Sequence, residues 1–116
     1  MKKMNISIKG YGENTATFAT DGVVCASHVV KLADNLTVSP CNTGDKFVGT
    51  AVNVKSGYAC IQLDGYVTVS YSGTAPSVGY CTLVADGNGG VKTGSAGREY
   101  LVTDVNEITK TAGIIL

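Results

Sequence analysis

The sequence predicts an all-β fold, either a small β-sandwich or a partly closed β-barrel of short antiparallel strands. Apolar residues alternate with polar ones over short runs, and turn-forming residues recur about every 8 to 12 positions. A chain of 116 residues is long enough to bury one modest core. We therefore expect an N-terminal arm, residues 1–20, followed by a single β domain, residues 21–116.

The N-terminal arm differs in pattern from the rest of the chain. Met4, Ile6 and Ile8 alternate with polar residues, and two glycines then flank Tyr11 before a link rich in Thr and Ala. An apolar strand of this kind can add to an exposed sheet edge of another protein, where main-chain hydrogen bonds supply affinity. We expect Met4, Ile6, Ile8 and Tyr11 to contact such a partner.

The body of the chain opens at the turn-forming pair Asp21-Gly22 and continues as short strands. Between Gly44 and Tyr71, breaks at 55–57 and at Asp64-Gly65 indicate consecutive hairpins. Asp-Gly suits a two-residue hairpin turn, because both central residues need positive φ. The expected strands are 23–25, 29–32, 36–38, 47–54, 58–63, 66–71, 79–85, 90–93, 100–105 and 111–116.

The glycine-rich run at residues 86–90 has two interpretations. Phosphate-binding loops place their glycines between a strand and the N-terminus of a helix. Here another short strand is expected to follow, so we interpret the run as a hairpin tip.

A weak self-match relates the two halves of the body. Shifting the chain by 53 positions pairs Val38 with Val91 and Ile61 with Ile114, among others. The match is either a chance result of β-rich composition or the trace of a shared supersecondary unit. Pairing two such units would hide sheet edges.

Charge and hydropathy argue against several classes of partner. Nine basic and nine acidic residues balance and are scattered along the chain, so no long-range field gathers nucleic acid or an anionic membrane. No run approaches the ~20 apolar residues that span a bilayer, and the alternation near the start is unlike a signal peptide. We expect a product made in the cytoplasm, without nucleic-acid or membrane partners.

The cysteines and acidic residues do not have metal-ligand spacing. Cys25, Cys41, Cys60 and Cys81 form no C-x-x-C pair. We expect free, buried thiols, although an even number leaves disulfides open. Isolated acidic residues offer no calcium-loop series, so neither a metal nor a cofactor is expected.

His28 is the single histidine of the chain. A hydrolase using His28 with Cys25 would need those side chains to meet in a cleft, and no G-x-S-x-G elbow is present to offer another nucleophile. We expect no catalytic residues.

Tyrosines outnumber the other aromatic residues, with six Tyr, two Phe and no Trp. Tyr66 alternates away from Val67 and Val69, so its ring is expected to leave the core face. Tyrosine suits subunit contacts, but it equally suits cross-strand pairs on a solvated sheet face. We take Tyr66 and Tyr71 as candidate interface residues; they point to opposite faces, so at most one is central.

The segment from Val29 to Val69 carries a resemblance to a known family. Its landmarks are Gly44-Asp45, Gly49-Thr50-Ala51, Gly57 and Gly65, and the second half adds Val78-Gly79-Tyr80 and the closing residues 113–116. In this arrangement the chain resembles the small capsid cement, or head decoration, proteins of tailed phages. It departs from their pattern where Gly79 lacks a following Asp, and at residues 98–100, where a small residue and glycine are usual.

The resemblance implies a non-enzymatic protein that binds the outside of an assembled icosahedral shell. It implies the major capsid protein as partner, a place on the virion exterior after assembly in the host cytoplasm, and often a homotrimer at local three-fold positions. A displayed head-fibre module that recognises host surface glycans through exposed tyrosines remains the alternative, and it would require an aromatic-lined groove.

Overall fold

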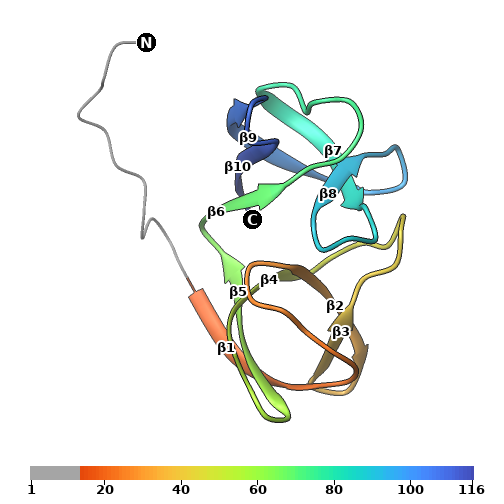
Figure 1. Cartoon of the computed structure of the whole chain (residues 1–116), viewed down its shortest axis with the longest axis vertical. Coiled ribbons are helices and arrows are strands. Elements are labelled where there is room, and N and C mark those ends of the chain that lie inside the picture. Colours follow the sequence, from red (N-terminus) through yellow and green to blue (C-terminus); the bar gives the residue numbers. More distant parts are fainter. Residues whose placement is uncertain (1–13) are drawn as a thin grey trace, which may run out of the picture.

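The computed structural model describes residues 14–116, which form ten strands and no helix, confirming the all-β class (Figure 1). The strands fall into two groups that meet at the middle of the molecule, and the chain passes once from one group to the other (Figure 1). Their bounds are β1 (Asn14–Thr20), β2 (Val29–Asp34), β3 (Thr37–Pro40), β4 (Gly49–Lys55), β5 (Tyr58–Asp64), β6 (Tyr66–Ser70), β7 (Gly79–Ala85), β8 (Val91–Thr93), β9 (Arg98–Asn106) and β10 (Thr111–Ile115).

The first five strands close into a barrel in the order β1-β3-β2-β4-β5. β1 completes it by pairing antiparallel with β5 and parallel with β3. The expected arm boundary at residue 20 is therefore wrong, because 14–20 are a barrel strand. The Thr- and Ala-rich sequence contains one large apolar side chain, Phe18, so alternation is weak there. The strand forms because the edges of β3 and β5 offer it hydrogen-bonding partners.

The other five strands form a sheet in the order β6-β10-β9-β7-β8. A parallel bridge between Tyr71 and Val91 brings its two ends together. In the first barrel, Thr20 pairs in parallel with Val38 at the corresponding place. The second sheet therefore curls into the same arrangement as the first and is called the second barrel here.

The two barrels repeat one supersecondary unit, as the self-match at 53 positions suggested. In chain order, β6 to β10 occupy the places of β1 to β5, and the hairpins β4–β5 and β9–β10 correspond. Ile61 and Ile114, the pair found by the shift, are both fully buried. The repeat buries equivalent side chains in both barrels, but only the first is fully closed by strand pairing.

The predicted hairpin at Asp64-Gly65 is wrong. β5 pairs with β1 on one edge and β4 on the other, so no edge of β5 is left for β6. The chain turns at Gly65, which has φ 92°, and enters the second barrel. Local turn chemistry was correctly recognised there, but closure of the first barrel decides which strands pair.

Two other turn assignments hold. β4 and β5 join through Ser56 and Gly57, with Gly57 at φ 80°. The glycine-rich run is the tip between β7 and β8, which pair antiparallel. Buried Asp86 organises it by accepting hydrogen bonds from the main-chain N–H groups of Asn88 and Gly90 and from the Ser72 hydroxyl. These bonds satisfy a carboxylate that burial would otherwise penalise.

An aromatic stack joins the two barrels. Phe47, from the first half, lies parallel to Tyr100 of β9 with ring centroids 4.9 Å apart. The Tyr100 hydroxyl donates to the carbonyl of Phe47 at 3.2 Å. Val29 and Cys41 join the same buried cluster as the second-barrel residues, whereas Ile61 belongs to a separate cluster inside the first barrel.

The four cysteines are free but differ in exposure. Cys41 is buried, Cys60 and Cys81 are half-buried, and Cys25 is exposed. The expectation of buried thiols is therefore wrong for Cys25, since residues 23–25 form no strand. Burial raises the pKa of Cys41 to about 11, and the nearby Asp45 carboxylate acts in the same direction.

Alkylation at neutral pH should label Cys25 first and Cys41 last. Raising the Cys41 pKa from 9.0 to about 11 lowers its thiolate fraction about a hundredfold. Mass spectrometry of time-resolved, non-reduced samples measures the order. Equal labelling of Cys25 and Cys41, or two intramolecular disulfides in fresh protein, would contradict the expectation.

Candidate docking surfaces

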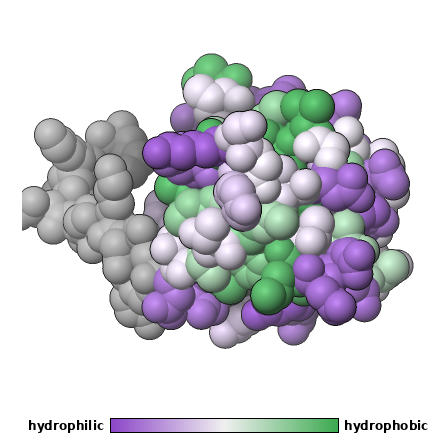
Figure 2. All heavy atoms as spheres, turned by 90° about the horizontal axis from the view of Figure 1, so that it is seen from below, coloured by the Kyte–Doolittle hydropathy of each residue, from purple (hydrophilic) through white to green (hydrophobic). Residues whose placement is uncertain are grey.

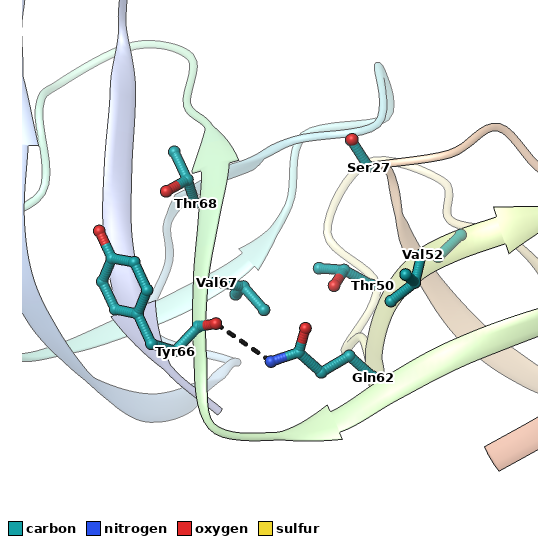
Figure 3. Close-up of a pocket in the computed structure, with 8 residues that line it drawn as sticks. Ser27, Thr50, Val52, Gln62, Tyr66, Val67 and Thr68 are labelled. Atoms are coloured by element: carbon teal, nitrogen blue, oxygen red, sulfur yellow. Dashed lines mark hydrogen bonds between the residues drawn. The ribbon is translucent and has the colours of Figure 1, made fainter. Parts of the chain in front are cut away.

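A hollow of about 480 Å³ lies between the two barrels, where the chain crosses from β5 to β6 (Figure 3). Thr50 and Gln62 line it from the first barrel, and Val67 and Thr68 line it from the second. Gln62 is 7% exposed, and its amide donates to the carbonyls of Asp64 at 2.9 Å and Tyr66 at 3.0 Å. One buried side chain thus ties together both sides of the crossing.

The second-barrel wall of this hollow is an open strand edge. β6 pairs along its length with β10, and on its other side only the residue after it, Tyr71, is bridged to β8. Thr68, in the middle of β6, is exposed and lines the hollow. An edge of this kind can accept an added extended segment.

An apolar row crosses four strands on the outside of the second barrel. Tyr66 pairs with Ile115, Ile115 with Leu101, and Leu101 with Tyr80. Residues directly opposite in antiparallel strands share a face, so these four side chains form one continuous outer row. Tyr80 is 73% exposed and Leu101 is 37% exposed, whereas Tyr66 and Ile115 are half-buried.

Tyr66 stands at one end of the outer row. Its hydroxyl donates to Asp104 at 3.1 Å, and its ring points away from the hollow between the barrels (Figure 3). Partial burial raises the Tyr66 pKa, and the charge of Asp104 adds to that effect. The predicted outward orientation of Tyr66 is therefore confirmed, and its role in a subunit contact stays a prediction.

Tyr71, the other candidate interface residue, lies in the core. It is 5% exposed and packs in the same cluster as Val67 and Val69. The assignment of Tyr71 to a subunit interface is therefore wrong, because its side chain offers almost no surface to a neighbouring subunit. The sequence pattern already indicated that Tyr71 is buried, because residues 67, 69 and 71 share one face by period-2 alternation.

The remaining predicted contact residues, Met4, Ile6, Ile8 and Tyr11, lie outside the described residues. Leu101 and Tyr80 of the outer row were missed by sequence reasoning. Tyr100, Leu101 and Val102 are all apolar, so alternation could not indicate which of them point outward.

The first barrel carries its exposed apolar side chains differently. Figure 2 views the molecule from the first-barrel end and shows apolar groups scattered among polar ones. Tyr58, which is 61% exposed, pairs across the strands with Lys55. Beside them is a shallow hollow of about 160 Å³, also lined by Thr17, Asn53 and Cys60.

Cys25 and His28 both line a third hollow, of about 280 Å³, beside the glycine-rich tip. The main-chain N–H of His28 donates to the carbonyl of Cys25 at 3.2 Å. The His28 ring packs so closely on Gly89 that a Cβ there would lie 2.3 Å from Nδ1. Within residues 14–116, no side-chain hydrogen bond joins the Cys25 thiol to the His28 ring.

No group of three or more His, Cys, Asp or Glu side chains within residues 14–116 is placed to hold a metal ion. The same part of the chain contains no helix that could cross a membrane. No protein-family model matches the sequence, and no curated protein matches it either.

Proposed function

We propose that this chain is a non-enzymatic capsid cement protein, which binds the outer surface of an assembled tailed-phage shell and stabilises it. The proposal rests on the structural positions of the glycines that mark the family resemblance. Gly44, Gly57 and Gly65 all have positive φ at turns. Gly49 lies where a Cβ would come 2.2 Å from the carbonyl oxygen of Gln62. The resembling residues thus occupy positions that shape the barrel.

Binding to the major capsid protein is assigned to Met4, Ile6, Ile8 and Tyr11 on the basis of their sequence pattern. These residues precede β1, whose first residue, Asn14, donates to Asp64 at 3.3 Å beside the crossing. A homotrimer would present three such segments and multiply a weak contact through avidity. The protein would then lie on the virion exterior after assembly in the host cytoplasm.

A glycan-binding head-fibre module is not favoured by the hollow between the barrels. Sugar rings stack on exposed aromatic faces, but the Tyr66 ring points away from that hollow (Figure 3). Binding to host surface glycans without binding to shells would support that alternative instead.

Co-sedimentation with undecorated shells tests the proposal. The full chain should pellet with shells, and deletion of residues 2–12 should reduce the pelleted fraction at least tenfold, because the apolar contact is lost. The deletion ends before Asn14 and leaves every barrel strand intact, so the melting temperature should change little. Full-length protein that stays in the supernatant with shells of its own phage would overturn the proposal.

A further inference from the structure

We propose that the outer row binds a second copy of this chain, at the shallow hollow on the first barrel of that copy. The row consists of Tyr66, Ile115, Leu101 and Tyr80, and the hollow lies beside Lys55 and Tyr58. This contact goes beyond shell binding, because it forms between free subunits without any capsid.

The repeat shows that strand pairing does not require an apolar outer row. At the corresponding places in the first barrel, Thr15 pairs with Gln62, Gln62 with Thr50, and Thr50 with Val29, the one apolar residue of the four. Gln62 and Thr50 are covered by the second barrel and line the hollow between the barrels, and Val29 packs in the buried cluster that joins the two barrels. This face of the first barrel is therefore a packing surface. The equivalent face of the second barrel is apolar and is left uncovered by residues 14–116.

Charge indicates which surface covers the row. Glu99 lies two residues before Leu101 on the same face of β9 and is exposed. Asp104, also exposed, accepts the Tyr66 hydroxyl. If the outer rows of two copies packed face to face, these carboxylates would come together and repel each other. A basic partner surface would instead be complementary to them.

The shallow hollow has the matching chemistry. Lys55 supplies a positive charge, and Tyr58 beside it supplies an exposed apolar ring. The depression of about 160 Å³ next to them gives room for a projecting side chain, such as the highly exposed Tyr80. Aromatic anchors entering a recess are typical of the residues that dominate interface energy.

The row and the hollow lie on different barrels of one chain. Two copies can exchange both contacts about a two-fold axis; otherwise the contact is heterologous, and each copy offers its row to one neighbour and its hollow to another. Such contacts close into rings when the rotation permits and otherwise extend into filaments. Closure after the third copy gives the homotrimer expected for the proposed function.

Light scattering of three variants tests the contact, without shells. The row variant carries Leu101→Ser and Tyr80→Ser, the hollow variant carries Tyr58→Ser, and the control carries Ile108→Ser. Ile108 is 94% exposed on the turn between β9 and β10, so its loss should change nothing. All substituted side chains are at least partly exposed, and circular dichroism and melting verify that each variant folds.

The wild type and the control should self-associate at micromolar concentration, whereas the row and hollow variants should each lose at least tenfold in self-association. Mixing the row and hollow variants should restore complexes of two chains, because one intact row then meets one intact hollow. A monomeric wild type, unaffected variants, or a mixture that stays monomeric would each overturn the contact. Shell binding is measured separately by co-sedimentation, so either proposal can fail without the other.

Discussion

Deletion of residues 2–20 is expected to unfold the first barrel. β1 pairs with β5 from Asn14 to Ala19 and with β3 at Ala19 and Thr20, so its loss opens the barrel on both sides. Phe18, which packs against the inner cluster of the first barrel, is lost with it. Hydrogen exchange with mass spectrometry should show the amides of β2 to β5 losing their protection, because unpaired strand edges exchange with solvent.

Deletion of residues 2–12 is the matched control, since it leaves β1 complete. Its exchange pattern within β2 to β5 should equal that of the full chain. A 2–20 deletion that retains full protection would show that the first barrel is stable as an open sheet. That result would contradict the structural role assigned to β1.

Phe47→Ala should destabilise the protein by about 3–5 kcal/mol, the range for truncating a buried aromatic side chain. Phe47 is 4% exposed and stacks on Tyr100 at 4.9 Å, so truncation leaves a cavity at the joint between the barrels. The melting temperature should fall by roughly 10 °C or more for a domain of this size. Urea unfolding monitored by circular dichroism gives the free energy of unfolding.

Tyr100→Phe separates the hydrogen bond from the stack. It keeps the ring but removes the donor to the Phe47 carbonyl, so the loss should be about 1 kcal/mol. If Phe47→Ala lowers the free energy of unfolding by no more than Tyr100→Phe does, the stack does not hold the barrels together.

Several features of the fold were predictable because they depend on neighbouring residues. Alternation located nine of the ten strands, all but β1, to within a few residues. Glycine chemistry located the turn at Gly57 and the hairpin tip with Gly87 and Gly89, since positive φ is a local requirement. The weak match between Ile61 and Ile114 indicated the repeat, because equivalent positions in two barrels bury similar side chains.

The candidate surface was only partly predictable. Tyr66 was expected to face outward and does so, whereas Tyr71 was missed as a core residue although its alternation with Val69 placed it inward. Leu101 and Tyr80 lie far apart in the sequence and become neighbours only through the pairing of β7 with β9. No local sequence pattern predicts which residues of β7 and β9 lie opposite each other.

By itself, the sequence determined the all-β class, the turns and the periodicity that makes one face of most strands apolar. The tertiary structure alone decided that 14–20 close the first barrel and that Asp64-Gly65 links two barrels. It also decided that four separate residues align as the outer row. The reason is that propensity and alternation act over a few residues, whereas strand partners are chosen by which hydrogen-bonding edges remain free after the whole chain has folded.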